Sequence, residues 1–546
     1  MTQSKFLKYQ TESASYLFCS DTNEIFRECS PEDPCCSQHD NMQKIKVIER
    51  CAPDGMASSA SGNPVEFLSN SQTSGNTKRK PSGIVLYDKR YTFDEFLSDH
   101  SRLLTIELTR KCNLRCEYCG FGKHYTRYRS HSAESVPREI AEKAIADHLN
   151  KKKSGRTVAF YGGEPLLEFA LLEYLVLFAK KFSKDAAMPM PSFSITTNGT
   201  LLTEDIIHFL VEHDFSVLLS IDGDRETHNR FRLFQCDGRG SFDVVEENLW
   251  RFVELYPDYL KRGLSVTTTA CTNFRKTNEF LKDVTLFYPS IIINGTNPFL
   301  GVNYPIDAVA CERAGCARLE SASRNAVPDF LDWTNERIEK MQECLNDFKA
   351  TLLRSWQQAC DEWPFFYPNH LQRMLRIHER KVTRSSYGKL ACACLPGAVR
   401  LFCDIDGNYY PCERVETSNT NLCIGNVWTG IDAGKVRSMI DYMIDVTNCE
   451  DCTGKHLCSI CPSSMTNNHL EELCDAEILR HCYDHPRAVM TNLIDYTTIM
   501  EVYPSKLDAI LESNSHVASE ILQDDWVSDL QFCMSSRHND VCESNI

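Results

Sequence analysis

The sequence predicts an α/β fold built around a partial (β/α)6 barrel of the TIM type. Segments of strand character and segments of helix character alternate across residues 101–296, which indicates a parallel sheet covered by helices. The alternation supplies six strands, so the barrel is an incomplete version of the eight-fold one. Cysteines crowd residues 390–482, and this predicts a second, cysteine-rich domain after the barrel.

Within the barrel, we expect a helix between each strand and the next. The expected elements are strand 103–109, helix 137–153, strand 157–161, helix 166–182, strand 192–197, helix 204–213, strand 216–221, helix 242–256, strand 264–270, helix 276–286 and strand 291–294. In barrels of this type the chemistry belongs at the C-terminal ends of the strands. The loops after the strands are therefore the places to look for functional residues.

The chain divides into five expected regions. They are an N-terminal region with a linker at 1–98, the barrel core at 99–300, a helical connector at 301–385, the cysteine-rich domain at 386–490, and a C-terminal helix with an acidic tail at 491–546. The turn signal Asp21-Thr22-Asn23 lies between apolar runs, so we expect a hairpin at Tyr16–Arg27. The tail has few apolar anchors and is expected to be partly disordered.

Composition narrows the class of protein. The 546 residues carry 59 Lys and Arg against 75 Asp and Glu, so 59 − 75 gives a net charge of −16. That charge argues against a general nucleic-acid binder and against electrostatic attachment to an anionic membrane. The opening residues lack a secretory signal, and no apolar run approaches the roughly 20 residues of a spanning helix. With 27 cysteines, too few at this length for a disulfide scaffold, we expect a cytoplasmic protein with reduced thiols and metal or redox chemistry.

Three cysteines follow the first expected barrel strand. Cys112, Cys116 and Cys119 form the pattern C-x3-C-x2-C. Three thiolates from one short loop can hold three irons of a [4Fe–4S] cluster and leave the fourth iron open to a ligand. A structural zinc site is the alternative, but zinc takes four protein ligands, usually in C-x2-C pairs, and this loop supplies three with unequal gaps.

This spacing, with an aromatic residue before the third cysteine, resembles the radical S-adenosylmethionine (SAM) superfamily. In that family the open iron binds SAM, and reductive cleavage of SAM gives a 5′-deoxyadenosyl radical. The resemblance implies that Tyr118 lies near the adenine. It continues at Gly162-Gly163-Glu164-Pro165 after the second strand, where the glycines let backbone approach a ligand closely and the resemblance makes Glu164 an acceptor for the methionine ammonium.

Two further strand ends match the same family. Thr197-Asn198-Gly199 ends the third strand, where family members often contact SAM. Ser220-Ile221-Asp222-Gly223 ends the fourth, with His228 and Arg232 after it, as in members that modify peptides and proteins. The resemblance makes Asn198, Ser220 and Arg232 contacts of SAM, whereas His228 is as readily an exposed or capping residue as a functional one. Asp224 stands where a proline often follows Asp-Gly, so the loop geometry is expected to differ.

The later cysteines resemble the SPASM domain of radical SAM enzymes, which carries two auxiliary [4Fe–4S] clusters. Cys394, twelve residues, Gly407, four residues and Cys412 match its first half, and C-x2-C-x5-C-x2-C from Cys449 to Cys461 matches its second, one residue short in the last gap. The resemblance implies two ligand groups: Cys394, Cys412 and Cys461 for the nearer cluster, and Cys449, Cys452, Cys458 and Cys482 for the outer one.

Some of these ligands have alternatives. Cys392 is a candidate fourth ligand of the nearer cluster; otherwise that iron is open and can bind a peptide thiolate. Cys474 competes with Cys482 as the last ligand, and Cys482 is preferred because the segment from His485 then leads into a helix. Cys403 lies in a β-like segment and is expected to be a packed thiol. A zinc ribbon is the alternative for the group from Cys449 to Cys461.

The resemblance implies an enzyme that modifies peptides or proteins by radical chemistry. We expect a maturase of a ribosomally synthesised precursor peptide that forms cysteine thioether cross-links. The N-terminal region is then expected to capture the leader of that peptide by adding it as a strand to a sheet edge. The expected cofactors are SAM, its [4Fe–4S] cluster and two auxiliary [4Fe–4S] clusters, and the electron donor is a flavodoxin or ferredoxin.

Two other functions remain open from the sequence. An anaerobic sulfatase-maturating enzyme, which oxidises Cys or Ser to formylglycine, resembles the chain across the core and the SPASM domain. Those enzymes usually carry an Asp, proposed as a base, after the cysteine that Cys412 matches; here it is Glu413, the candidate catalytic residue. The other class is a non-catalytic zinc-binding adaptor.

Overall fold

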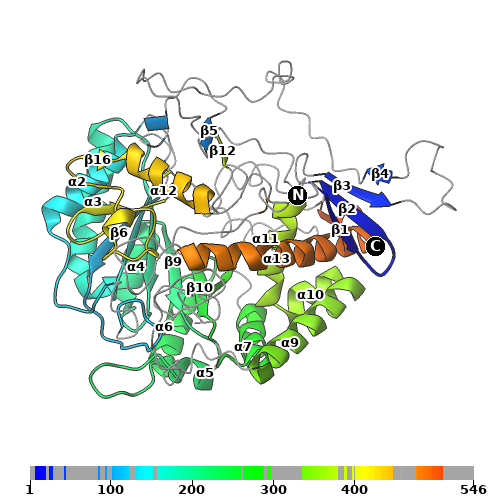
Figure 1. Ribbon diagram of the computed structural model, residues 1–546. Helices are drawn as coiled ribbons and strands as arrows, with labels where there is room; N and C mark the ends of the chain where they lie inside the picture. Colours follow the sequence, from blue (N-terminus) through cyan, green and yellow to red (C-terminus); the bar gives the residue numbers. More distant parts are fainter. Residues whose placement is uncertain are drawn as a thin grey trace, which may run out of the picture.

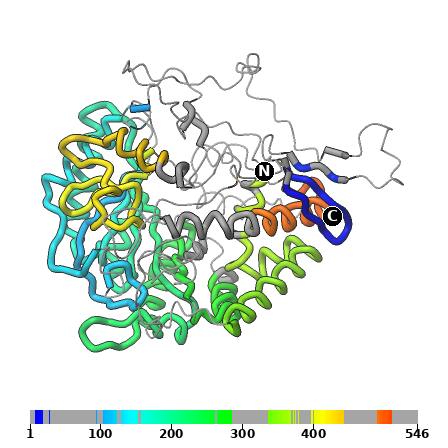
Figure 2. Tube along the Cα trace, in the orientation of Figure 1, coloured from blue at the N-terminus to red at the C-terminus, as the bar shows by residue number. Residues whose placement is uncertain are grey.

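Figure 1 shows the chain as a computed structural model. The structure describes residues 6–19, 24–28, 42–44, 84–86, 93–94, 97, 101, 103–122, 129–151, 156–259, 262–269, 271–287, 292–296, 335–378, 387–389, 396–398, 400–446, 457, 475–507 and 509. Within that part, a large sheet with its helices occupies one side of the molecule. The long helix α13 (Asp475–Val502) runs from there to a small N-terminal sheet on the other side (Figure 1, Figure 2).

The large sheet has the strand order β11-β10-β9-β8-β7-β6-β13-β14-β15-β16. Its barrel strands are β6 (Leu103–Thr109), β7 (Thr157–Gly162), β8 (Ser192–Thr197), β9 (Phe215–Ser220), β10 (Arg262–Thr267) and β11 (Ile292–Thr296). These six are parallel, and strands consecutive in the chain are neighbours in the sheet. This confirms the predicted α/β fold with six parallel strands.

Helices connect these strands as the alternation predicted. They are α2 (Arg138–Leu149), η1 (Pro165–Glu168), α3 (Phe169–Asp185), α4 (Glu204–Glu212), α5 (Arg225–Asn229), α6 (Phe242–Leu255) and α7 (Phe274–Phe287). The short helix α5 was not predicted. Asp224 caps it, because its carboxylate accepts from the Glu226 amide at 3.3 Å. The residue that departs from the family pattern therefore starts a helix.

The cysteine-dense region extends the same sheet. Strand β13 (Arg400–Cys403) pairs in parallel with β6, and β14 (Asn408–Tyr410), β15 (Gly425–Asn426) and β16 (Gly430–Ile431) follow antiparallel. Cys403 is fully buried, so its interpretation as a packed thiol is confirmed. The turn η3 (Thr420–Leu422) and helix α12 (Ala433–Val446) complete the described part of this region.

Three helices occupy the described part of the expected connector. They are α9 (Asn335–Arg354), α10 (Trp356–Glu362) and α11 (Phe366–His378). Two polar contacts join them to α13: the His378 ring lies 2.9 Å from the Tyr496 hydroxyl, and Lys349 lies 2.7 Å from the Asp495 carboxylate. The connector and the C-terminal helix therefore form one packed unit.

The N-terminal sheet is antiparallel throughout. Its strands are β1 (Phe6–Gln10), β2 (Ser15–Cys19), β3 (Glu24–Glu28) and β4 (Met42–Lys44). Strands β2 and β3 pair Tyr16 with Arg27, which confirms the predicted hairpin. The sheet packs on α13, where the Tyr9 hydroxyl lies 2.8 Å from the Thr497 hydroxyl and the Tyr16 hydroxyl donates to Glu501. A separate pair joins β5 (Ile84–Leu86) to β12 (Tyr387–Lys389).

One predicted helix boundary is wrong. The segment from His485 was expected to lead into the C-terminal helix, but α13 already begins at Asp475 and contains Cys482. Acidic residues favour a helix N-terminus, and the first turn from Asp475 includes Glu477. The argument that preferred Cys482 over Cys474 on the ground of this boundary therefore fails.

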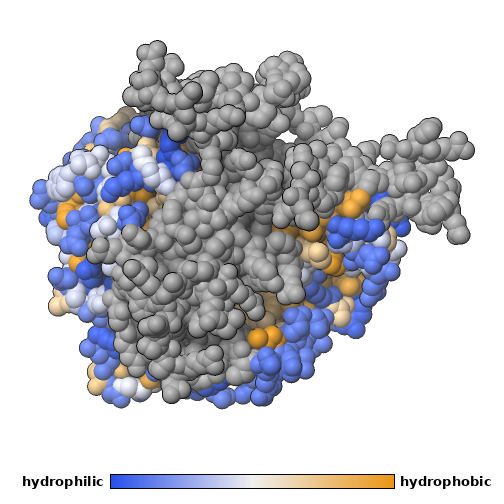
Figure 3. All heavy atoms as spheres, viewed as in Figure 1, coloured by the Kyte–Doolittle hydropathy of each residue, from blue (hydrophilic) through white to orange (hydrophobic). Residues whose placement is uncertain are grey.

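The described residues on the face shown in Figure 3 are mostly hydrophilic. In the view of Figure 3, hydrophobic residues are scattered among hydrophilic ones over the part of this face that is coloured. None of the helices among the described residues combines the length and the apolar character needed to cross a bilayer.

Two glycines let the end of β7 lie against the end of β6. A Cβ on Gly162, whose φ is +140°, would stand 2.2 Å from the Thr109 carbonyl oxygen, and one on Gly163 would stand 2.1 Å from that of Lys111. The backbone hydrogen bonds there are 2.8 Å from Gly163 to Thr109 and 2.7 Å from Glu164 to Lys111. The close approach that these glycines permit is therefore to the loop that leads to Cys112.

We predict that Gly163→Ala lowers the stability of the chain by more than about 2 kcal/mol, because its Cβ meets backbone that cannot move aside. Gly238→Ala is the control: this position has φ +73° and nothing within 4 Å of a Cβ, so the change costs only the left-handed strain of about 1–2 kcal/mol. Anaerobic urea unfolding measures both. Equal losses in the two variants would contradict the assignment.

Candidate active site

Cys112, Cys116 and Cys119 lie in the loop after β6, as predicted. The loop is compact, since the Cys119 amide donates to the Cys116 carbonyl at 3.1 Å. Two of the sulfurs also accept backbone N–H groups at 3.4 Å, from Leu114 to Cys112 and from Phe121 to Cys119. The thiols therefore already lie in a setting that hydrogen-bonds sulfur, which is one of the features that tunes iron–sulfur centres.

The three thiols are half-buried residues of one loop. Burial raises the pKa of each, that of Cys116 to about 12, and the neighbouring thiols raise the pKa of Cys112 further. Among the described residues, no three His, Cys, Asp or Glu side chains are arranged to hold a single metal ion. A [4Fe–4S] cluster binds each cysteine through a different iron, so its ligands stand apart. Three thiols in one loop match, as a donor set, three of the four irons of a [4Fe–4S] cluster.

Glu164 is a fully buried carboxylate beside this loop. One oxygen accepts from the Thr197 hydroxyl at 2.7 Å and the Leu166 amide at 3.0 Å, and the other accepts from the Asn198 amide at 2.7 Å. Burial raises the pKa of Glu164 against these bonds. Since a carboxylate has about four acceptor positions, one remains on the oxygen that Asn198 contacts, enough for one further donor such as an ammonium.

Asn198 joins the end of β8 to the thiol loop. Its side-chain nitrogen Nδ2 donates to the side-chain oxygen of Asn113 at 2.9 Å and lies 3.9 Å from the Cys112 sulfur. Asn113 in turn donates to the Thr200 hydroxyl at 2.8 Å. The predicted residue is thus brought to the site, next to the first thiol.

Asp222 is the centre of a buried charged group after β9. Its carboxylate accepts from Arg232 at 2.9 Å, from the Thr267 amide at 3.2 Å and from the Tyr118 hydroxyl. The Arg232 guanidinium lies 4.0 Å from the Cys116 sulfur and 5.5 Å from the centre of the Tyr118 ring. Burial opposes the charge on Arg232, but Asp222 outweighs it and the pKa of Arg232 is raised.

Sequence reasoning named Arg232 and Tyr118 as site residues but gave Asp222 no role. The signal was present, because a carboxylate in Ser-x-Asp-Gly followed by an arginine is a candidate ion pair. Ser220, the last residue of β9, lies nearby at 9% exposure. The structure brings all four residues to the same strand ends as the thiol loop.

His228 is neither exposed nor a capping residue. It is fully buried, its Nδ1 accepts from the Asp222 amide at 3.3 Å, and its Nε2 lies 3.0 Å from the Ser241 hydroxyl. Ser241 donates onward to the Arg232 carbonyl at 3.0 Å. Burial lowers the pKa of His228 to about 3. A neutral imidazole therefore holds the backbone of both members of the Asp222–Arg232 pair, that of Asp222 directly and that of Arg232 through Ser241.

The turn after β14 carries Cys412 and Glu413. The Glu413 carboxylate lies 3.0 Å from Arg400, and its carbonyl accepts from Arg129 at 2.5 Å. Burial raises the pKa of Glu413, but the charges of Arg400, Arg414 and Arg129 outweigh it and the pKa is lowered. The predicted base is therefore held as a carboxylate within an ion pair.

Most of the other predicted ligands fall outside the part of the chain that the structure describes. Cys392, Cys394, Cys449, Cys452, Cys458 and Cys461 lie outside the described residues, and so does the alternative Cys474. Of Cys482, the structure describes only its position within α13.

Residues 106–278 match the Radical SAM superfamily. The cysteine-type anaerobic sulfatase-maturating enzyme of Clostridium novyi (strain NT) is 32% identical over 139 residues, 25% of this chain and 36% of that one. The serine-type anaerobic sulfatase-maturating enzyme of Bacteroides thetaiotaomicron is 30% identical over 140 residues, 25% of this chain and 33% of that one. The matched stretches span about a third of the length of these relatives.

The fold of a solved structure agrees. Native anSMEcpe with bound AdoMet superimposes with a TM-score of 0.51 and 19% identity, over 75% of this chain and 99% of that one. Six parallel strands, the thiol loop at their C-terminal ends and the superfamily match define a radical SAM domain. Residues 106–278 of the chain therefore form a radical SAM domain.

The buried His228 predicts a pH dependence of stability. The folded chain keeps this ring neutral down to about pH 3, whereas the unfolded chain takes up a proton near pH 6.5. The contribution of His228 is therefore fully present above pH 6.5 and is lost as the pH falls, by about 1.4 kcal/mol per pH unit. In His228→Asn, unfolding between pH 6 and 4 should take up about one proton fewer. Exposed His208→Asn is the control, and an unchanged slope in His228→Asn would contradict the assignment.

Because the ion pair is buried, we expect a single variant of it to lose much more stability than the double variant. Asp222→Ala leaves the Arg232 charge buried without its partner and should lower the free energy of unfolding by about 3–5 kcal/mol. The double variant Asp222→Leu/Arg232→Met should recover much of that loss. Asp243→Ala, in the exposed pair with Arg225, should change stability by less than about 1 kcal/mol. Anaerobic urea unfolding decides; a loss below 1 kcal/mol in Asp222→Ala would refute the role of this pair.

Proposed function

We propose that the chain is a maturase that modifies a ribosomally synthesised peptide and forms cysteine thioether cross-links. The observation that carries the proposal is the set of side chains around the thiol loop. Glu164, Asn198 and the Asp222–Arg232 pair come from three different strand ends and converge on it. This is an arrangement for holding one bound cofactor beside a metal cluster.

The chain's own residues have distinct parts in this proposal. Cys112, Cys116 and Cys119 would hold the [4Fe–4S] cluster, which together with SAM supplies the radical that removes hydrogen from an unactivated carbon. Glu164 offers its remaining acceptor position to the methionine ammonium. Arg232, fixed by Asp222, places a positive charge beside the Cys116 sulfur.

Two features support a peptide substrate. The relatives are named for the maturation of sulfatases, which are themselves polypeptides. The N-terminal sheet has β1 and β4 as its edge strands, and an extended peptide binds such an edge through its backbone. We therefore propose leader capture by this sheet, with a flavodoxin or ferredoxin as the electron donor and a cytoplasmic location.

The auxiliary clusters belong to the same proposal. Arg129 links the turn that bears Cys412 to the segment after the thiol loop, because it donates to the Glu413 carbonyl and stands over the ring of Phe121. We propose that Cys392, Cys394, Cys412 and Cys461 hold the nearer auxiliary cluster and that Cys449, Cys452, Cys458 and Cys482 or Cys474 hold the outer one. A cluster at Cys412 would then lie next to the substrate.

Oxidation of Cys or Ser to formylglycine is the second candidate, and the names of the relatives favour it. It gives Glu413 the role of base. The ion pair with Arg400 and the lowered pKa weaken a base, so the geometry favours cross-linking instead. The match to the superfamily disfavours the zinc-binding adaptor.

Product mass tests the proposal. The enzyme would be co-expressed anaerobically with short cysteine-containing peptides encoded beside its gene. A thioether removes two hydrogen atoms, so a serine-free peptide should lose about 2 Da per cross-link, whereas conversion of Cys to formylglycine removes about 18 Da. Serine is left out of the peptide because its conversion to formylglycine also removes about 2 Da. Cys116→Ala should abolish the change, and Cys344→Ala, a buried cysteine on α9, should preserve it.

An unchanged peptide mass would contradict cross-linking for that peptide. Metal analysis of the same preparation checks the cofactors separately. Three clusters require about twelve irons and twelve sulfides per chain, and a few zinc ions in their place would support the adaptor.

A further inference from the structure

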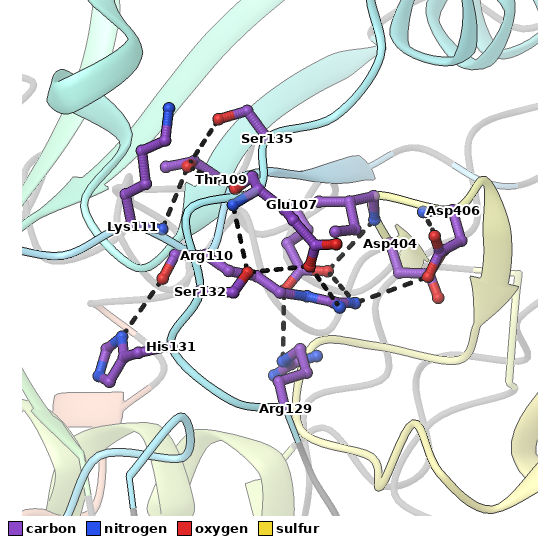
Figure 4. Close-up of polar contacts among 12 residues, drawn as sticks. Glu107, Thr109, Arg110, Lys111, Arg129, His131, Ser132, Ser135, Asp404 and Asp406 are labelled. Carbon is purple, nitrogen blue, oxygen red and sulfur yellow. Dashed lines mark hydrogen bonds and ion pairs between the residues drawn. The ribbon is translucent and has the colours of Figure 1, made fainter.

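A buried polar cluster joins the end of β6 to the turn between β13 and β14. Its centre is Glu107, whose side chain is fully buried and accepts from the Ile405 amide at 3.2 Å and from Arg110 at 3.3 Å. Arg110 also reaches Asp406 at 3.8 Å. Figure 4 shows Arg110 between Glu107 and Asp406, and Arg129 near the Glu107 carboxylate. The turn is therefore held to the barrel by charge as well as by strand pairing.

Arg129 is the member of this cluster that reaches furthest. Its side chain is 1% exposed and lies 3.8 Å from Glu107. The guanidinium stands over two rings, 5.0 Å from the centre of Phe121 and 4.7 Å from that of Phe402. From there it donates to the Glu413 carbonyl at 2.5 Å. One planar group thus touches the barrel, the loop after the thiols and the turn after β14.

The two segments that Arg129 joins are those that carry cysteines. The amide of Phe121 donates to the Cys119 sulfur at 3.4 Å, and Glu413 directly follows Cys412. A buried arginine with a rigid fork loses little freedom when it makes several contacts at once. Its position between two aromatic faces also fixes the plane of the fork.

We propose that Arg129 is a positioning residue that sets the separation between the Cys112–Cys119 loop and the Cys412 turn. The importance of that separation for the reaction rests on the proposed function, in which both segments hold clusters. The contacts themselves do not depend on it. Glu107 serves as the counter-charge that makes a buried arginine tolerable at this place.

Hydrogen–deuterium exchange on the full-length, iron-loaded enzyme tests the proposal without any peptide. In Arg129→Met, which keeps an unbranched chain but removes the fork, exchange at residues 119–122 and 412–416 should rise at least about tenfold while α2 stays unchanged. Arg138→Met is the matched control, since this exposed arginine also stands over a ring, 3.5 Å from the centre of Tyr174. It should leave both segments unchanged.

The reduction potential of the [4Fe–4S] cluster at Cys112, Cys116 and Cys119 gives a second readout. A purely structural role of Arg129 would not change this potential. Loss of a buried positive charge near Cys119 disfavours the more negative reduced cluster, so Arg129→Met should shift the potential to more negative values. Arg129→Lys should restore the potential, because it keeps the charge. It should not restore the exchange protection, since one ammonium cannot replace a fork held between two rings.

Each outcome decides. Unchanged exchange in the two segments, or a uniform rise across the chain, would overturn the proposal. If Arg129→Met does not fold, Arg129→Lys carries the test, and parental protection at 412–416 in that variant would overturn it equally. Localised exchange together with an unmodified peptide would leave Arg129 in its positioning role and remove the proposed function instead.

Discussion

Strand β6 is hydrogen-bonded on both edges, and the positions of the elements on either side depend on it. On one side it pairs with β7 of the barrel, and on the other with β13 of the cysteine-dense region. A strand buried on both faces is usually apolar throughout, yet Glu107 lies in its middle with no exposed surface. The strand tolerates this carboxylate because Ile405 and Arg110 donate to it. The thiol loop at its end and the turn that leads to Cys412 therefore share a single support.

Two buried guanidinium groups lie near the thiol loop, each with its own carboxylate. Arg232 is paired with Asp222 inside the barrel, and Arg129 with Glu107 at the junction with β13. A charge taken out of water costs several kcal/mol unless it is paired, so neither arginine is there for stability alone. Burial raises the pKa of the Cys119 thiol, whereas the charges of both arginines lower it. The arginines therefore favour the loss of the proton that a thiol gives up when it binds a metal.

Local patterns could be predicted from the sequence and distant pairings could not. The strands, the helices and the thiol loop depend on periodicity and spacing within a few residues, and they lie close to where they were expected. The pairing of Arg400 with Leu103 joins residues far apart in the chain, and no pattern within a few residues predicts it. His228 and Gly163 show a second limit, because motif matching finds such residues without showing what they touch. The first supports Asp222 from behind, and the second lies against Lys111.

The anchoring of the N-terminal sheet on α13 has a consequence for biosynthesis. The contact between the Tyr9 and Thr497 hydroxyls spans 488 residues, a stretch that a ribosome translates in about 25 to 100 s. Tyr9 and Tyr16 are buried in the finished protein, but the helix that anchors them is translated long after them. These strands therefore leave the ribosome well before they can reach their native surroundings. Until then the nascent chain carries an unsupported β-sheet, which is the kind of segment that chaperones shield.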